Sequence, residues 1–360
     1  MNYQKLFDQL RPFYCLLVTL TLLGCSSSSP DEEVPSGPSD LSMTVDIVGA
    51  TSAAPNGDGS GEVVVSFSAK NATSYKVNFG NGDTKETTSN SVSYKYVGNG
   101  THTYKIFVSA YKGPDFVSAS ESLTIYVAPG LVWSDEFDEN GAPDSSKWGY
   151  DTGAGGWGNN EPQFYTSRSE NVKVENGLLK ITAKKETYEG APYTSARIKT
   201  QGKFSFKYGK VEVRAKLPEG GGTWPAIWML GSNFQTVGWP ACGEIDIMEH
   251  KGNDPGVIHS ALHTPSSYGA TNNHGTKTVA NVSSEFHVYG VEWTSQKIAF
   301  SVDGNVFYTY MPANKNGSTW PFDANQFIIL NVAMGGVFGG DIDPDFTSGT
   351  MEIDYVRVYQ

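Results

Sequence analysis

Residues 243–250 read Gly-Glu-Ile-Asp-Ile-Met-Glu-His, and this run carries three carboxylates. Side chains alternate between the two faces of a β-strand, so Glu244 and Asp246 share one face. Strict alternation would put Glu249 on the opposite face, but one extra residue, a β-bulge, returns it to the same side. The residues between the acids are isoleucine and methionine, which predicts that the other face of this strand is buried.

Three acids on one sheet face repel one another, and a purely structural strand avoids that arrangement. Glycoside cleavage, in contrast, needs two carboxyl groups that face one bond, one ionised and one protonated. The alternative is a solvated acidic strand face without a catalytic role. Because the intervening residues are apolar, the run favours a catalytic acid cluster over that alternative.

The composition excludes several classes of partner. The net charge of −12 argues against nucleic acid and against an anionic membrane surface. Aromatic residues make up 12% of the chain, and all eight tryptophans lie beyond residue 130. Aromatic rings with a polar handle suit sugar rings, so the two halves of the chain are expected to do different work.

Residues 1–24 have the form of a secretion signal. Their apolar run, 13–23, is too short for a membrane span. The sequence Leu-Leu-Gly-Cys at 22–25 resembles a bacterial lipobox, which implies cleavage before Cys25 and lipidation of that cysteine. Residues 25–40 read as a flexible tether. Their acidic part resembles the tether of surface lipoproteins, which implies a lipid anchor in the bacterial outer membrane at the cell surface.

Thiol and zinc chemistry are less favoured. Cys242 is the one cysteine in the folded part, so a disulfide framework is excluded. Its place two residues before Glu244 suggests a nucleophile, but a small buried residue is the better interpretation, because no base partner is evident. His259 and His263 are four apart, as in helical zinc sites, but their surroundings read as strand and loop.

Residues 41–128 contain short alternating runs separated by turn signals such as Asn81-Gly82, which predicts a small Ig-like β-sandwich. Residues 77–83, followed by 100–104, resemble a PKD domain, although Val77-Asn78 stands where that family has Trp-Asp. The expected role is a spacer. Glycan binding is unsupported because this segment has no tryptophan.

Residues 129–360 begin after a boundary at Pro129-Gly130 and again show many short strands without long helical periodicity. Two large antiparallel sheets packed face to face are expected, so the whole chain is predicted to be all-β.

This second segment resembles glycoside hydrolase family 16, and within it the laminarinase-like endo-β-1,3-glucanases. The likeness runs through residues 158–166, 193–200, 223–231 and 320–336. It implies a β-jelly-roll with a substrate cleft along its concave sheet. Laminarinases carry the signature Glu-x-Asp-x-x-Glu, whereas lichenases carry Glu-x-Asp-x-Glu, and this chain has the longer form.

By this resemblance Glu244 is the nucleophile and Glu249 the general acid/base of a retaining double displacement, with Asp246 assisting. A retaining pair stands about 5–5.5 Å apart. At that separation two carboxylates do not both ionise cheaply, so one keeps its proton. The resemblance implies no cofactor for catalysis.

The resemblance also implies substrate-binding residues. Trp224 and Trp228 are four apart in an extended stretch, so they point to the same side and read as stacking platforms, with core packing as the alternative. The other positions that it assigns to substrate binding are Arg197, Trp239, His263, Asn159 and Glu161.

Members of the family hold a structural Ca²⁺ on the convex face, and the matching positions here are Glu136, Gly177 and Asp354. Oxygen ligands suit this hard cation, which would stabilise the fold without entering the chemistry.

The leading hypothesis is an endo-hydrolase of β-1,3-glucan such as laminarin, which also cuts mixed-linkage β-1,3/1,4-glucan. One alternative is a family 16 enzyme that acts on agar- or carrageenan-type galactan, because those relatives share the bulged motif. A surface glycan-binding lipoprotein on an inactive hydrolase fold is another, and a structural adhesin a third. The expected form is a monomer.

Overall fold

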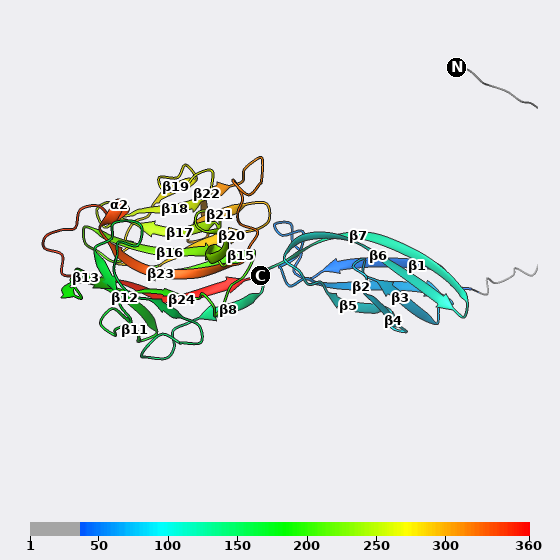
Figure 1. Cartoon of the computed structure of the whole chain (residues 1–360). Coiled ribbons are helices and arrows are strands. Elements are labelled where there is room, and N and C mark those ends of the chain that lie inside the picture. The colour runs from blue at the N-terminus through cyan, green and yellow to red at the C-terminus, as the bar shows by residue number, and fades with distance from the viewer. Residues whose placement is uncertain (1–36) are drawn as a thin grey trace, which may run out of the picture. The chain divides into compact units, whose positions relative to one another are not determined.

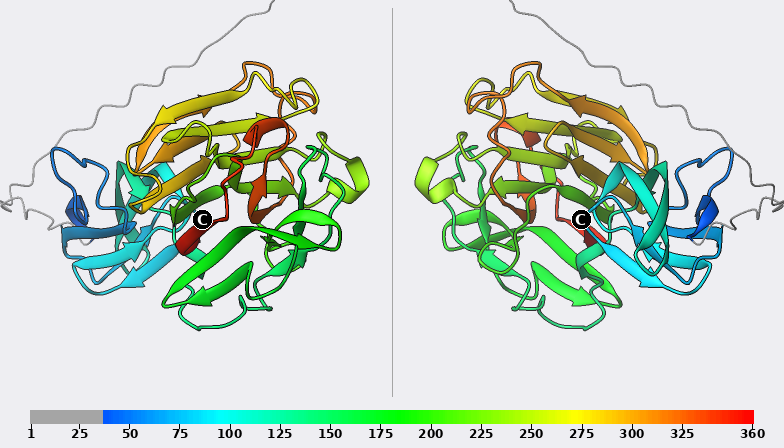
Figure 2. Two further views of the ribbon diagram at one scale, coloured as in Figure 1. Left: turned by 90° about the vertical axis from the view of Figure 1, so that its left-hand side faces the viewer. Right: turned by 90° about the vertical axis from the view of Figure 1, so that its right-hand side faces the viewer.

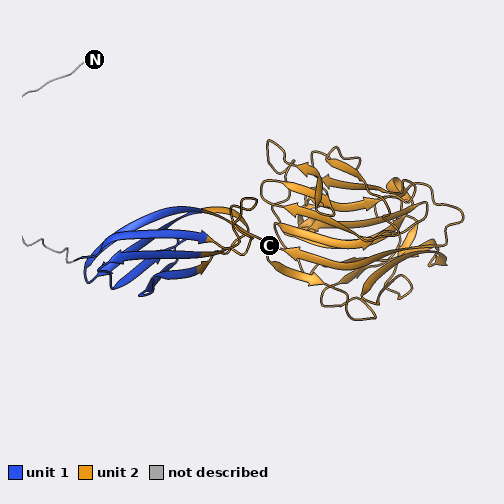
Figure 3. Ribbon diagram, turned by 180° about the vertical axis from the view of Figure 1, so that it is seen from behind, with its two compact units in different colours: residues 1–46, 64–93, 104–123 blue, residues 47–63, 94–103, 124–360 orange. Residues whose placement is uncertain are grey.

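The computed structural model describes residues 37–360, and strands make up almost all of their regular structure (Figure 1). The predicted signal at residues 1–24, the lipidation site Cys25 and most of the tether lie outside the described residues. The chain divides into two compact units (Figure 3). The first contains residues up to 46, 64–93 and 104–123, and the second contains 47–63, 94–103 and 124–360. Between residues 37 and 360, no helix is long and apolar enough to cross a membrane.

Seven strands precede residue 128 and form two sheets, with strand orders β1-β2-β5 and β4-β3-β6-β7. Alternate side chains of the longer strands are buried, as the sequence pattern predicts. The sequence pattern did not predict β4, because its residues Thr-Lys-Glu-Thr carry no apolar side chain. The strands are β1 (Ser39–Ile47), β2 (Glu62–Lys70), β3 (Ser74–Asn78), β4 (Thr84–Thr87), β5 (Ser91–Lys95), β6 (Gly100–Lys112) and β7 (Asp115–Val127).

The later strands form a seven-stranded and a ten-stranded sheet that lie face to face (Figure 2). The smaller sheet has the order β19-β18-β17-β16-β23-β14-β9. Its strands are β9 (Gly149–Asp151), β14 (Arg197–Lys199), β16 (Thr223–Gly231), β17 (Glu244–His250), β18 (Val257–His263), β19 (His274–Thr278) and β23 (Gln326–Met334).

The larger sheet has the order β10-β13-β12-β24-β15-β20-β21-β22, with β11 beside β12 and β8 beside β24. Its strands are β8 (Leu131–Asp135), β10 (Gln163–Tyr165), β11 (Val172–Glu175), β12 (Leu178–Tyr188), β13 (Ala191–Ser195), β15 (Gly209–Lys216), β20 (His287–Trp293), β21 (Ile298–Val302), β22 (Asn305–Tyr310) and β24 (Ser348–Tyr359). Two one-turn helices interrupt the loops, α1 (Phe234–Val237) and α2 (Gly336–Gly339).

The expectation of wholly antiparallel sheets is wrong at one edge. Strands β10 and β13 pair in parallel, with Gln163 opposite Tyr193. No hairpin joins these two strands directly, so chain connectivity does not impose an antiparallel direction on them. The other pairings between the strands of the two large sheets are antiparallel.

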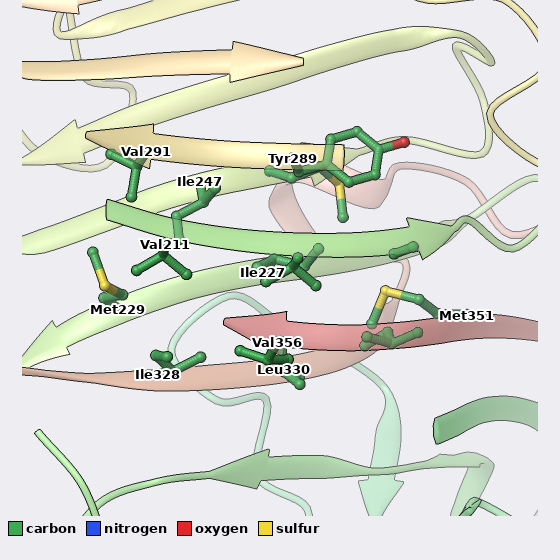
Figure 4. Close-up of a cluster of buried hydrophobic side chains, with 14 of the residues drawn as sticks. Val211, Ile227, Met229, Ile247, Tyr289, Val291, Ile328, Leu330, Met351 and Val356 are labelled. Atoms are coloured by element: carbon green, nitrogen blue, oxygen red, sulfur yellow. The ribbon is translucent and has the colours of Figure 1, made fainter. Parts of the chain in front are cut away.

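The core of the second unit is the space between its two sheets. Ile227 and Leu330 from the smaller sheet meet Val211 and Val356 from the larger one, and all four are fully buried (Figure 4). Because their inner side chains fill this core, the strands of the smaller sheet turn their alternate side chains to the outer face. The functional site described below lies on that outer face.

Leu330→Ala is expected to destabilise the second unit by about 2–5 kcal/mol, because the side chain is 0% exposed at the centre of the core. The control Val306→Ala removes a side chain that is 60% exposed on β22 and should change stability by no more than about 0.5 kcal/mol. Denaturant unfolding followed by tryptophan fluorescence measures both. Equal effects of the two substitutions would contradict this placement of the core.

Candidate active site

Strand β17 contains the predicted bulge. Asp246 pairs with Ala261 of β18 and Glu249 pairs with His259, so three steps along β17 match two along its neighbour. The pairing of β17 with β16 shows a register shift in the same place. The extra residue restores Glu249 to the face of Asp246. Ile247 and Met248, which occupy the bulge, are both buried in the core.

The three acids lie in one cleft on the outer face of the seven-stranded sheet. Its volume is about 300 Å³. The predicted residues Trp224, Trp228 and Trp239 lie in the same cleft, so the expectation that the first two point to one side is confirmed. The residues that line the cleft are Trp157, Gly158, Asn159, Glu161, Arg197, Trp224, Ala226, Trp228, Leu230, Trp239, Glu244, Asp246, Glu249, Asn331 and Ala333.

Each glutamate accepts a hydrogen bond from a tryptophan. Trp224 Nε1 donates to Glu249 Oε1 at 2.9 Å, and Trp239 Nε1 donates to Glu244 Oε2 at 3.0 Å. These indole donors fix one oxygen of each carboxyl group while the rest of the group faces the cleft. The two tryptophans therefore orient the acids.

His263 lies beside the acids and is absent from the cleft lining, although the sequence assigned it to substrate binding. Its Nδ1 accepts a hydrogen bond from the backbone N–H of Gly269, so the neutral ring carries its proton on Nε2. That nitrogen lies 3.2 Å from Asp246 Oδ2 and 3.6 Å from Glu244 Oε1. His263 thus lies against the Glu244 side of the acid cluster.

Burial raises the pKa of Glu244, Asp246 and Glu249 to about 8 in each case. The neighbouring Asp246 adds to the rise for both glutamates, because like charges disfavour ionisation. His263 and Arg197 oppose the rise for Glu244. The three carboxyls therefore share protons at neutral pH, which is the condition that a general acid requires.

Arg197 is held between aromatic rings at one side of the cleft. Its guanidinium lies 4.7 Å from the ring centre of Trp228 and 5.1 Å from that of Trp157. Its Nε is 3.0 Å from Asp151 Oδ2 on the adjacent strand β9. The arginine is thus held in place in the cleft, and its contact with substrate stays a prediction.

A buried polar network supports Trp228, and the sequence did not predict it. Trp228 Nε1 donates to Asn331 at 2.8 Å, Asn331 donates to the Tyr165 hydroxyl at 3.1 Å, and that hydroxyl donates to Glu161 at 3.1 Å. Glu161 also accepts from Asn159 at 3.0 Å. Asn331 is the one polar residue in the apolar run Ile-Ile-Leu-Asn-Val-Ala, and this exception was the signal that could have revealed it.

The predicted substrate-binding residue Glu161 is only 7% exposed, and both of its oxygens accept hydrogen bonds within this network. Gln163 donates the remaining bond at 2.7 Å. The side chain is therefore an anchor for its neighbours, whereas Asn159 stays at the cleft surface.

The three positions predicted for calcium, Glu136, Gly177 and Asp354, come together through strand pairing. Asp135 of β8 lies opposite Val356 of β24, and Leu179 of β12 lies opposite Ile353 of the same strand. Both carboxylates already have arginine partners. Glu136 accepts two hydrogen bonds from Arg357, and Asp354 accepts one from Arg214 at 2.7 Å. A calcium ion would accordingly fit backbone carbonyl oxygens better than these carboxylates, and its presence stays a prediction.

A two-sheet β-sandwich with paired buried carboxyl groups in a tryptophan-lined cleft is the architecture of a glycoside hydrolase. The model of the glycosyl hydrolases family 16 matches residues 159–357, and the chain belongs to this family.

Named relatives match about two thirds of the chain. A β-glucanase of Rhodothermus marinus is 47% identical over 244 residues, which are 64% of this chain and 85% of the relative. A glucan endo-1,3-β-glucosidase A1 of Niallia circulans is 39% identical, over 64% of this chain and 38% of the relative. The solved laminarinase of Rhodothermus marinus is 46% identical with a TM-score of 0.62, over 64% of this chain and 97% of that structure.

Asp246→Asn is expected to stabilise the protein at pH 8 and to leave its stability unchanged near pH 4. Burial raises the folded-state pKa of Asp246 from its usual 3.8 to about 8, so the folded state retains a proton that the unfolded state releases. Stability therefore falls as the pH rises through this window, and the amide removes that loss.

Unfolding midpoints of the wild type and Asp246→Asn at pH 4 and pH 8 measure the effect. The same change at an exposed acid, Asp345→Asn, is the control. A stabilisation by Asp246→Asn that is equal at the two pH values would contradict the raised pKa.

Proposed function

We propose that the protein is a retaining endo-hydrolase of β-1,3-glucan that also accepts mixed-linkage β-1,3/1,4-glucan. The observation that carries the proposal is the bulged strand β17, which sets Glu244 and Glu249 on one face in a cleft lined by tryptophans. The names of the relatives, β-glucanase, glucan endo-1,3-β-glucosidase and laminarinase, support the same substrate class.

The chemistry follows from the two glutamates. Glu249, protonated, gives its proton to the leaving oxygen while Glu244 attacks the anomeric carbon and forms a glycosyl-enzyme. Glu249 then takes a proton from the water that hydrolyses this intermediate, so the anomeric configuration is retained. Asp246 and His263 adjust the charge of Glu244.

The charge of the cleft favours a neutral glucan over a sulfated galactan. Four carboxyl groups, those of Glu161, Glu244, Asp246 and Glu249, line the cleft. Its one arginine, Arg197, is paired with Asp151. An anionic polysaccharide would meet net repulsion here, whereas a neutral glucan can stack on Trp224 and Trp228. Carrageenan-type substrates are therefore disfavoured.

The direct test is the release of reducing ends from laminarin, lichenan, agarose and carrageenan, with NMR detection of the first anomer formed. We expect rapid release from laminarin, slower release from lichenan, and a β-anomer as the initial product. Release from agarose alone would identify the substrate as a galactan. Binding without release would favour the alternative of a glycan-binding lipoprotein.

Glu244→Ser is expected to abolish turnover of laminarin, and Glu249→Gln to lower kcat by at least about 100-fold, because the leaving oxygen loses its acid. Glu292→Gln, at an exposed acid of β20, is the matched control and should keep full activity. Assays at the pH optimum with folded protein, checked by circular dichroism, give the comparison. Wild-type activity in Glu244→Ser would exclude the proposed nucleophile.

We also propose that Cys25 is lipidated, that the anchor lies in the outer membrane at the cell surface, and that the strands before residue 128 act as a PKD-like spacer for a monomeric enzyme. The lipobox-like sequence at 22–25 and the acidic tether support this placement. Expression of Cys25→Ser in a bacterial host with labelled fatty acid tests it. Label retained by the variant would contradict lipidation at this residue.

A further inference from the structure

The loop of residues 335–343, called here the Phe338 loop, follows β23 and contains α2. Two other segments hold it through backbone hydrogen bonds. The N–H of Gly335 donates to the carbonyl of Gly222 at 2.7 Å, and the N–H of Val337 donates to the carbonyl of Asn159 at 2.9 Å. These bonds fix the start of the loop, and the N–H of Asp343 donates to the carbonyl of Gly221 at 3.2 Å at its end.

Between these fixed ends, Asn253 of the loop after β17 holds the Phe338 loop through a side chain. Its Nδ2 donates to the carbonyl of Gly339 at 2.7 Å and to that of Asp341 at 2.9 Å. The amide lies close to the backbone between them, since a Cβ on Gly340 would come within 3.1 Å of the same nitrogen. One side chain thus binds both carbonyls that flank Gly340.

The Phe338 loop packs against Trp224, the tryptophan that donates to Glu249. The ring centre of Phe338 lies 5.2 Å from that of Trp224 and 5.1 Å from that of His259. A Cβ on Gly339 would come within 3.3 Å of Trp224 Cβ, so the loop backbone also packs on this residue. Trp224 therefore has little freedom to turn its indole N–H away from Glu249.

We propose that Asn253 is a positioning residue for Glu249, and that it acts through the Phe338 loop and Trp224. The path consists of contacts already described: Asn253 holds the loop, Phe338 packs on Trp224, and Trp224 donates to Glu249 Oε1 at 2.9 Å. The assignment of Glu249 as the acid/base rests on the proposed function.

These contacts affect the pKa of Glu249 because a hydrogen-bond donor to a carboxylate favours its ionised form. The bond from Trp224 lowers the pKa of Glu249 and so opposes the rise caused by burial and by Asp246. Displacement of Trp224 therefore raises that pKa further. The other charged or titratable groups that face Glu249 are Asp246 and Glu244 on β17, His259 and His263 on β18, and Lys251 beyond the end of β17.

The indole ¹H–¹⁵N resonance of Trp224, assigned by its loss in Trp224→Phe, reports the ionisation of Glu249 without any substrate. In Asn253→Ala its titration midpoint should rise by about half a pH unit or more, because the donor is less well placed. Phe338→Leu, which keeps the hydrogen bonds of the loop, should shift the midpoint in the same direction. Asn305→Ala removes an exposed amide that also donates to a backbone carbonyl, at 3.1 Å, and should leave the midpoint unchanged.

Enzyme assays give a second measurement. In Asn253→Ala the alkaline limb of the pH profile of kcat/KM should move to higher pH. The variant should lose more in kcat than in affinity. In the Trp224→Phe background the same substitution should cause no further shift, because both changes interrupt one path.

An unchanged indole midpoint in folded Asn253→Ala and Phe338→Leu would overturn the proposal, as would shifts that add in the double variant. The indole titration needs no turnover, so its result stands even if the wild type releases no sugar. Failure of the proposed function and failure of this inference are therefore distinguishable.

Discussion

Repulsion among three buried carboxyl groups is the constraint on which the site depends. Glu244, Asp246 and Glu249 occupy one face of a single strand. Burial raises the pKa of each, and the charge of Asp246 adds to the rise for both glutamates. A strand face of this kind is costly to fold, and it persists because the other face is fixed in the core. Ile247 and Met248 are almost fully buried, so the bulge that aligns the acids has no room to relax.

Different neighbouring residues support the two glutamates of the cleft. On one side His263 and Trp239 contact Glu244, and on the other Trp224 contacts Glu249. Trp224 and Trp239 each donate an N–H to a carboxylate and line the cleft. Under the proposed function the same side chains would serve substrate binding and proton control, so changes to the loops behind them are expected to alter both.

Much of this arrangement follows from local sequence. The alternation of side chains along a strand, with one extra residue, predicts that the three acids share a face. The even separation of Trp224 and Trp228, four residues, predicts that their side chains point to the same side of the strand. The network of Asn331, Tyr165 and Glu161 could not be predicted in this way, because it depends on the pairing of strands far apart in the chain. The place of His263 beside Asp246 likewise depends on strand pairing and on a loop contact, and its role toward substrate stays a prediction.

The most direct measurement is a ¹³C NMR titration of the side-chain carboxyl groups of Glu244, Asp246 and Glu249, assigned by amide substitution at each position. The account predicts that all three titrate above the ordinary range of about 4 for such groups and that the cluster still holds at least one proton at pH 7. Three independent titrations near pH 4 would show that the carboxyls neither repel one another nor lack solvent. That result would contradict the shared-proton cluster and the acid/base role built on it.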